Sequence, residues 1–321
     1  MIKVTHLTKE YKIPAKEYRK SLRTMMKPPM TTIYGLQDIC LEMKKGEMVG
    51  LVGLNGAGKT TLIKTLTGIL TPTRGEVEVM GYCPCRQRKA YTNHIGVVMA
   101  QKSVLFYDLP VIESFKFFKS VYKIPDEKFD ARLELFKQYI GIGDLLHIPV
   151  RKLSLGQRMK CEITASLLHE PSVLFLDEPT LGLDIISKRS ILGLLKQINK
   201  DFGITLILTT HDIDDMSDLC ERILLLDHGH LVYDGGIAEI EERGNYKLVE
   251  LKCWEKLAIE EHKDIIYSVK YISERHMICK VRMEHLAQVL WLLQQYSSYI
   301  EDLNISDVSL KDVLFEFYAG K

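Results

Sequence analysis

The order of apolar and polar positions predicts strands alternating with helices over the first part of the chain. Residues 2–11 and 37–43 alternate between apolar and polar, which is typical of strands that bury one face. Predominantly apolar runs at 173–176 and 204–208 predict short strands buried on both faces, as in a parallel sheet. Over residues 111–168, apolar residues recur every three or four positions, which predicts helices. Strands alternating with helices indicate an α/β fold with a mainly parallel sheet.

A change of pattern at Gly235 and Gly236 predicts a domain boundary. Beyond it, alternating runs predict strands and helical spacing predicts helices, at residues 246–254, within 265–281, at 284–296 and at 310–318. We therefore expect an α/β domain with an antiparallel β subdomain and a helical insertion, followed by a small α+β accessory domain. The expected bounds are residues 1–236 for the first domain, about 102–168 for its helical subdomain and 237–321 for the accessory domain.

A basic segment interrupts the pattern between the first two strands. Lysines and arginines are interleaved with apolar residues at roughly helical spacing over residues 12–27, ending at Pro28 and Pro29. The spacing predicts an amphipathic helix. Such a helix could contact acidic lipid headgroups or a partner, or it could be a solvated insertion in a hairpin. One short basic run is a weak binding signal, so the pattern favours the solvated insertion.

The loop Gly-Leu-Asn-Gly-Ala-Gly-Lys-Thr connects an apolar strand to a helix. Because Gly53, Gly56 and Gly58 lack a Cβ, the backbone N–H groups around them can turn inward and line a concave anion site. Lys59 adds a point charge for the β- and γ-phosphates, and Thr60 offers a hydroxyl to Mg²⁺. The N-terminus of the helix adds partial positive charge. The loop therefore predicts a nucleoside triphosphate site.

Two adjacent carboxylates end one of the buried strands. Asp177 and Glu178 follow the apolar run directly, and active sites of open α/β sheets lie at the carboxyl ends of strands. Asp177 can hold Mg²⁺, directly or through water, opposite Thr60. Glu178 is then available to orient and polarise an attacking water. His211 follows the end of the next buried strand; a lone histidine is more often structural, but this position favours a functional role.

Composition narrows the function classes. The chain has 321 residues, of which 46% are hydrophobic, enough for two cores. Lys and Arg number 43 against 42 Asp and Glu, so the net charge of +1 gives no electrostatic case for nucleic acid as a partner. No apolar run approaches the ~20 residues that span a bilayer, and no signal peptide is evident. Seven scattered cysteines suit reduced thiols. We expect a cytoplasmic protein whose membrane role requires a partner chain.

The motif Leu-Ser-Leu-Gly-Gln, residues 153–157, lies before an apparent helix at 158–168 and before the acidic strand end. This order of motifs resembles the nucleotide-binding subunits of ATP-binding-cassette (ABC) transporters over residues 1 to about 236. The resemblance implies ATP and Mg²⁺ as ligands. The residues that it implies for ATP binding are Tyr11, which would stack on adenine, Gly53, Asn55, Gly56, Ala57, Gly58, Lys59, Thr60 and Thr61. Those that it implies for catalysis are Glu178, His211 and Gln101, with Thr60, Gln101 and Asp177 as Mg²⁺ ligands.

The signature motif departs from the usual Leu-Ser-Gly-Gly-Gln because Leu155 replaces the first glycine. In the family, the serine hydroxyl and the N–H of the second glycine meet the γ-phosphate that the opposite subunit binds. Ser154 and Gly156 keep these groups, so the resemblance implies that Ser154, Leu155, Gly156 and Gln157 act in trans. Residues 181–184 match the family's D-loop. The Leu155 variant resembles a subgroup of exporter ATPases whose permease is a separate chain.

The resemblance implies an ATPase that lies on the inner face of the cell membrane through a transmembrane permease. Two copies, in the simplest case a homodimer, would associate head to tail with two ATP molecules bound between them. Hydrolysis of the ATP would separate the two copies. The helical insertion and the loop at Gln101 would face the permease and convert this closure into export of a substrate. The alternative is a soluble regulatory or signalling ATPase of the same type. Its accessory domain would need a ligand site of its own, and residues 237–321 show no motif for one.

Overall fold

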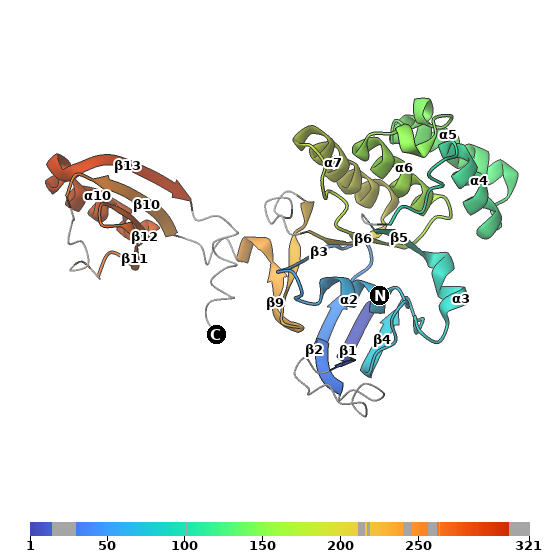
Figure 1. Cartoon of the computed structure of the whole chain (residues 1–321), viewed down its shortest axis with the longest axis horizontal. Helices are drawn as coiled ribbons and strands as arrows, with labels where there is room; N and C mark the ends of the chain where they lie inside the picture. Colours follow the sequence, from blue (N-terminus) through green and yellow to red (C-terminus); the bar gives the residue numbers. More distant parts are fainter. Residues whose placement is uncertain are drawn as a thin grey trace, which may run out of the picture. The chain divides into compact units, whose positions relative to one another are not determined.

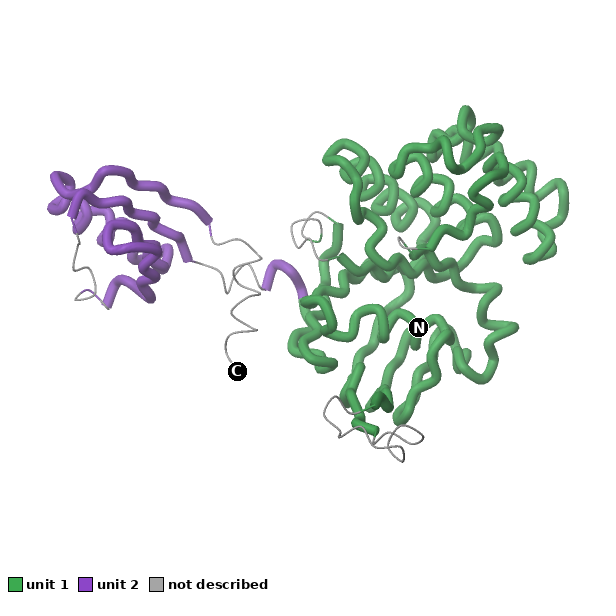
Figure 2. The backbone as a smooth tube through the Cα atoms, in the orientation of Figure 1, with its two compact units in different colours: residues 1–235 green, residues 236–321 purple. Residues whose placement is uncertain are grey.

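The structure is a computed structural model that describes residues 1–14, 30–99, 102–210, 216, 219–239, 246–255, 262 and 264–307. The chain divides into two compact units, Met1–Gly235 and Gly236–Lys321 (Figure 2). Gln101, His211, the helix expected at 310–318 and most of the basic segment lie outside the described residues. Among the helices of the described ranges, none is long and apolar enough to cross a membrane.

The central sheet of the first unit positions the predicted site residues. Its six strands lie in the spatial order β5 (Ile95–Met99), β6 (Val173–Asp177), β7 (Thr205–Thr209), β3 (Met48–Gly53), β8 (Arg222–Asp227) and β9 (His230–Gly236). The β5–β6, β6–β7, β7–β3 and β3–β8 pairs are parallel, as the apolar runs predicted. In this register Asp177 pairs with Thr209, and Thr209 with Leu51. The carboxyl ends of these strands therefore meet at one edge of the sheet.

A second, antiparallel sheet consists of β2 (Met30–Met43), β1 (Ile2–Pro14) and β4 (Arg74–Val79), in that order. The helix α2 (Lys59–Leu66) lies between the two sheets and contacts strands of both (Figure 1). Ile2 and Leu36 from the antiparallel sheet and Leu62, Ile63 and Leu66 from α2 are buried in one apolar core. The helix that follows the phosphate loop is thus held from both sides.

The β1–β2 hairpin is longer than the sequence predicted. Lys12, Ile13 and Pro14 continue β1 and pair with Thr32, Thr31 and Met30 of β2, where the start of an amphipathic helix was expected. Pairing between the strands satisfies the backbone groups of these residues and keeps them extended. The helix prediction is therefore wrong for residues 12–14, and the rest of the segment lies outside the described residues.

Helices α4 (Val111–Val121), α5 (Asp126–Tyr139) and α6 (Leu155–Leu167) form the predicted insertion between β5 and β6, and with α7 (Ile185–Phe202) they lie across the central sheet from α2 (Figure 1). The shorter elements of this unit are α3 (Arg88–Tyr91), η1 (Thr92–His94), η2 (Gly143–Leu145) and η3 (Val150–Lys152). Apolar side chains at helical spacing, such as Phe115, Leu133 and Phe136, are buried. The predicted helical insertion is confirmed.

The first turn of α6 corrects the expected position of the signature motif. We expected a loop up to Gln157 and a helix from Arg158, but α6 begins at Leu155. The Ser154 side chain accepts a hydrogen bond from the Gln157 amide, and the Gln157 side chain accepts one from the Ser154 amide. This capping box satisfies backbone groups at the helix start, which explains why the helix begins earlier. The signature motif is therefore the N-terminus of a helix.

The described residues of the second unit form a four-stranded antiparallel sheet with one main helix. The strands lie in the order β11 (Ser268–Ser273), β12 (His276–Arg282), β10 (Tyr246–Cys253) and β13 (Ile300–Asp307). The helical segments are η5 (Met283–His285), α10 (Leu286–Gln295) and η6 (Ser297–Tyr299). Val249, Leu251 and Met277 of the sheet pack with Val289 and Leu293 of α10. The sequence did not predict β13, an edge strand whose nearly complete exposure removes the alternating pattern.

Candidate functional site

The phosphate loop is folded around the ammonium group of Lys59. The Lys59 Nζ donates hydrogen bonds to the carbonyl oxygen of Gly53 at 2.6 Å and of Leu54 at 3.1 Å. Lys59 is only 7% exposed. Burial lowers the pKa of Lys59, while the charges of Glu178 and Asp177 act in the opposite direction. A partly desolvated cation is therefore held against the loop, next to two carboxylates.

The three glycines of the loop have structural reasons to lack a side chain. Gly58, the residue before α2, has φ +110°, and a Cβ there would lie 2.6 Å from the carbonyl oxygen of Gly35. A Cβ at Gly53 would lie 2.6 Å from the carbonyl oxygen of Leu226. Gly56 also has a positive φ, and nothing lies within 4 Å of its Cβ position. The outer part of the loop is thus free of protein atoms on that side.

Tyr11 lies beside the phosphate-loop helix. A Cβ on Gly35 would be 2.6 Å from Tyr11 Cε2 and 3.3 Å from Thr61 Cγ2, so the aromatic ring and the helix meet at this glycine. The Lys9 Nζ lies 5.6 Å from the centre of the Tyr11 ring. The structure thus brings Tyr11 next to Thr61. Of the other predicted residues of the loop, Asn55 is exposed and Ala57 is buried.

Asp177 ends β6 with its carboxylate between two threonine hydroxyls. Thr209 Oγ1 donates to Asp177 Oδ1 at 2.7 Å, and Thr60 Oγ1 donates to Asp177 Oδ2 at 3.4 Å. Thr60 comes from α2 and Asp177 from the sheet, and the structure brings them together. A hydroxyl and a carboxylate are hard oxygen donors, which Mg²⁺ prefers. The residues present therefore fit this ion.

Glu178 follows Asp177 in an unusual backbone conformation. Its φ of +55° lies in the left-handed region, which costs a residue with a side chain about 1 kcal/mol. The Glu178 amide donates to the Thr209 carbonyl at 3.1 Å and to Thr209 Oγ1 at 3.0 Å. Strained residues held by their surroundings are concentrated at functional sites. This observation supports a functional role for Glu178.

Thr209 is a site residue that the sequence reasoning missed. Its hydroxyl donates to Asp177 and accepts from the Glu178 amide, so one buried side chain positions both acids. The sequence contained a signal: Thr209 is a polar residue at the carboxyl end of a buried strand, two positions before His211. The pairing of β6 with β7 was needed to place it beside Asp177.

The signature motif packs against the D-loop. A Cβ on Gly156 would lie 2.8 Å from Ser187 Oγ, so α6 and α7 approach closely at this glycine. A Cβ on Gly182 would lie 3.2 Å from Leu155 Cδ2. Leu155, the departure from the usual motif, therefore places its side chain against the D-loop.

Asp184 fixes the start of α7 beside the signature motif. Its carboxylate accepts hydrogen bonds from the Ile186 and Ser187 amides at 3.0 and 2.9 Å and from Ser187 Oγ at 2.7 Å. These hydrogen bonds lower the pKa of Asp184. The D-loop aspartate thus caps the helix on which the signature glycine packs.

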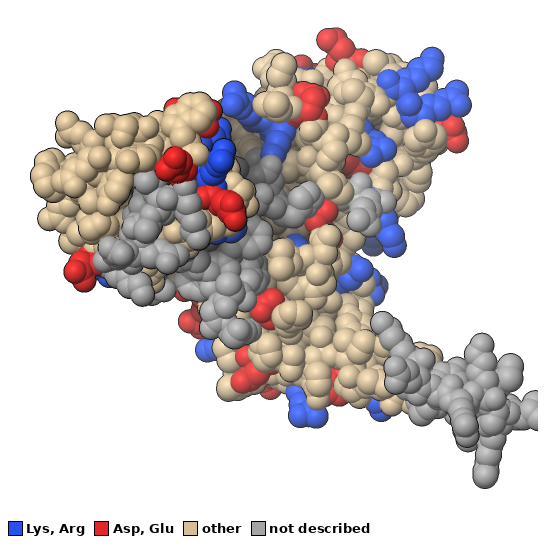
Figure 3. Space-filling model, turned by 60° about the vertical axis from the view of Figure 1, so that its left-hand side comes forward, with Lys and Arg blue, Asp and Glu red and all other residues tan. Residues whose placement is uncertain are grey.

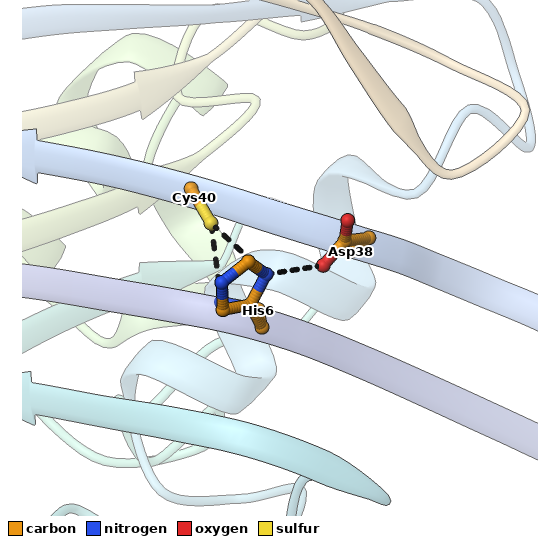
Figure 4. Close-up of side chains that lie close together, drawn as sticks. All are labelled: His6, Asp38 and Cys40. Atoms are coloured by element: carbon orange, nitrogen blue, oxygen red, sulfur yellow. Dashed lines mark hydrogen bonds and ion pairs between the residues drawn. The ribbon is translucent and has the colours of Figure 1, made fainter.

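Another group of potential metal ligands lies away from this site, on β1 and β2 (Figure 4). His6 Nδ1 is 2.7 Å from Asp38 Oδ1 and 3.7 Å from Cys40 Sγ, and all three side chains are exposed. Hydrogen bonds among the three residues account for this arrangement. None of the three is among the predicted site residues.

Comparison with known proteins agrees with the motifs. Residues 36–181 match the ABC transporter family. The uncharacterized ABC transporter ATP-binding protein MJ1023 of Methanocaldococcus jannaschii is 32% identical over 251 residues, which cover 74% of this chain and 90% of that protein. The ABC transporter ATP-binding protein NatA of Bacillus subtilis is 29% identical over 210 residues, covering 65% of this chain and 85% of NatA.

Solved structures show the same fold. The ATP-binding cassette MJ0796, as a dimer in a post-hydrolysis state bound to ADP and Pi, is 26% identical, with a TM-score of 0.62. The match covers 74% of this chain and 98% of that one. The fold and the site thus define an α/β P-loop ATPase of the ABC cassette class. The chain belongs to the family of ABC transporter ATP-binding proteins, and it is an ATP-binding subunit that hydrolyses ATP.

We expect Thr209→Val to lower the kcat of ATP hydrolysis by about tenfold. Valine has the shape of threonine, but it can neither donate to Asp177 nor accept from the Glu178 amide. Phosphate release at saturating ATP measures the effect. Thr209→Ser keeps the hydroxyl and should restore most of the rate. A loss of melting temperature without a loss of kcat would show that Thr209 only stabilises the fold.

Proposed function

We propose that this chain drives transport, in the export direction, through a separate transmembrane permease, using ATP sites that a second copy completes. The observation that carries the proposal is the meeting of Lys59, Thr60, Asp177 and Glu178 at one edge of the central sheet. These groups provide what phosphoryl transfer to water requires, which is positioning and charge stabilisation.

In the proposed reaction, the loop amides and Lys59 bind the phosphates of ATP. Thr60 and Asp177 would hold a Mg²⁺ whose charge offsets that of the β- and γ-phosphates. Glu178 then orients a water for attack on the γ-phosphate and polarises it. Tyr11 stacks on the adenine. The family resemblance adds Gln101 and His211 as catalytic residues, with Gln101 also on Mg²⁺.

An exposed apolar surface beside the signature motif supports dimerisation. Ile185 and Ile186, at the start of α7, are 72% and 82% exposed, and Leu155 and Leu181 lie in the adjoining segments with substantial exposure. Monomeric proteins rarely expose such contiguous apolar groups without a partner. In a symmetric dimer, Ser154 and Gly156 of each copy would face the ATP of the other. Solved relatives of this class include dimers.

A second exposed apolar surface supports docking to a permease. We call it the insertion face; its members are Val104, Phe106, Tyr107, Leu109 and Phe117. The rings of Phe106 and Phe117 are 5.1 Å apart, so the segment after β5 and helix α4 form one surface. A hollow of about 370 Å³ nearby is lined by Val104 and Phe118. A helix of the permease, on the inner face of the membrane, would fit this surface.

The experiment that tests the proposal is co-purification with membrane proteins that have multiple spans, chosen from neighbouring reading frames. We expect one of them to retain this chain, and Tyr107→Asp with Phe117→Asp to abolish retention while ATP binding stays unchanged. Leu135→Asp, at an exposed leucine of α5 outside the insertion face, is the matched control. Retention that survives the double variant would contradict docking through this face. If none of the candidate membrane proteins retains the chain, the soluble regulatory ATPase is favoured.

A further inference from the structure

A hollow of about 550 Å³ lies between residues 89–93, which precede β5, and residues 121–125, which form the turn that joins α4 to α5. Lys89 of α3 lines one side, and Lys123, Lys128 and Arg132 line the other. None of the residues of the phosphate loop or the insertion face lines it. The hollow is therefore separate from the phosphate loop and from the residues of the insertion face, although it shares Thr92 and Tyr122 with the hollow next to that face.

All the charged side chains that line this hollow are positive. Four of its lining residues are Lys or Arg, and among these lining residues, all of which the structure describes, none is acidic. The whole chain has a net charge of only +1, and acidic and basic side chains are both spread over the face drawn in Figure 3. Cations gathered in a concave site reinforce one another's potential and attract anions.

The lysines of the hollow differ from the ion-paired lysines of α4 and α5. Lys116 of α4 forms an ion pair with Glu113 at 2.9 Å, and Lys137 of α5 with Glu134 at 2.8 Å. Arg132 is likewise paired, through Nε, with Glu170 at 2.9 Å. By contrast, the side chains of the three lining lysines form no ion pair with any described residue; these are Lys89, Lys123 and Lys128. Their charge remains available to a ligand.

Two stacked rings form one wall of the hollow. His169 and Tyr122 both line it, with ring centres 3.8 Å apart and planes within 2°. His169 Nε2 donates to the Ile95 carbonyl at 2.8 Å, so Nδ1 is an acceptor. This buried Nδ1 has no hydrogen-bond partner among the described residues. The two stacked rings therefore form one wall of the hollow, and the lysines supply its charge.

We propose that this hollow binds a small phosphate-bearing anion, with Lys89, Lys123 and Lys128 supplying the charge. Its volume lies in the range of about 300–1,000 Å³ that is typical of small-molecule sites and exceeds what a bare phosphate needs. Lys89 precedes a strand of the central sheet, whereas Lys123 and Lys128 belong to the helical insertion. A bound anion would therefore link the insertion to the sheet.

The test measures binding of inorganic pyrophosphate by calorimetry in the full chain, with saturating ADP present to occupy the phosphate loop. We expect one additional site in the unchanged protein, weakened at least about tenfold by Lys123→Ala with Lys128→Ala, and also weakened by Lys89→Ala. Lys116→Ala with Lys137→Ala also removes two positive charges, from α4 and α5 outside the lining of the hollow, and should leave binding unchanged. ADP affinity and melting temperature show that each variant is folded, independently of any permease or dimer.

The source of the anion is distinguished in two further arms. Glycerol 3-phosphate in solution represents a free phosphorylated metabolite, and phosphatidylcholine vesicles with and without phosphatidic acid represent a lipid headgroup. Binding in either arm that is lost in the Lys123→Ala and Lys128→Ala variant supports the proposal and assigns the source. Absence of pyrophosphate binding, or equal weakening in the control variant, would overturn it.

Discussion

Glu178→Gln is expected to bind ATP as tightly as the unchanged protein and to hydrolyse it at least about 100-fold more slowly. Glutamine keeps the size of glutamate but cannot accept the proton of the attacking water. The backbone amide of Glu178 donates hydrogen bonds to Thr209, and the substitution leaves these bonds in place. Nucleotide binding at equilibrium and phosphate release at saturating ATP measure the two quantities separately.

The same variant tests the dimer. Because hydrolysis would release the two copies, Glu178→Gln with ATP should accumulate a dimer in size-exclusion chromatography, whereas ADP should give a monomer. Adding Ile186→Asp places a charge in the exposed apolar surface and should remove the dimer, while each monomer still binds ATP through its own phosphate loop. Adding Leu135→Asp, on α5, should leave the dimer unchanged. Normal turnover by Glu178→Gln would mean that another group activates the water.

The parts of the site that local sequence predicted are contiguous motifs. The phosphate loop and the Asp177–Glu178 pair each lie within a few residues at the end of a buried strand, so a short pattern contains both the residues and their placement. Alternation and apolar runs likewise predicted the strands of the central sheet and the helices of the insertion. In these segments, side-chain polarity reports directly on burial.

Other parts depend on contacts between distant segments. Thr209 is a site residue only because β7 pairs with β6 in a register that places it opposite Asp177. The contact of Leu155 with Gly182 requires the signature helix and the D-loop to meet, and no local sequence pattern predicts this contact. The edge strand β13 was missed because both of its faces are largely exposed, so polarity does not alternate along it. Pairing and packing, rather than local propensity, determine these features.

At the signature motif, a local sequence rule holds although the helix start that we expected from the sequence is wrong. Ser154 followed by Gln157 is a capping-box pattern, and the structure contains both of its hydrogen bonds. The helix was expected only from Arg158, after the motif. Leu155 and Gly156 instead belong to its first turn, where backbone N–H groups lack partners within the helix. Such unpartnered N–H groups are what the motif would need in order to bind the phosphate of an ATP molecule held by another subunit.

Lys59→Met is expected to weaken ATP binding by at least about 100-fold, because it removes the cation that faces the β- and γ-phosphates while keeping most of the side-chain volume. Burial lowers the pKa of Lys59, and bound phosphates would raise it again. Since only the protonated form attracts phosphate, ATP affinity of the unchanged protein should fall as the pH rises through the pKa that Lys59 has without nucleotide.

Lys59→Met should lose this alkaline decline of ATP affinity as well as most of the affinity itself. Fluorescence titration with a nucleotide analogue between neutral and alkaline pH measures both effects. Lys59→Ala is the comparison for packing: it also leaves a cavity next to the Gly53 and Leu54 carbonyls, so it should lower the melting temperature further than Lys59→Met. Equal nucleotide affinity in Lys59→Met and the unchanged protein would contradict the phosphate-binding role of Lys59, whatever happens to stability.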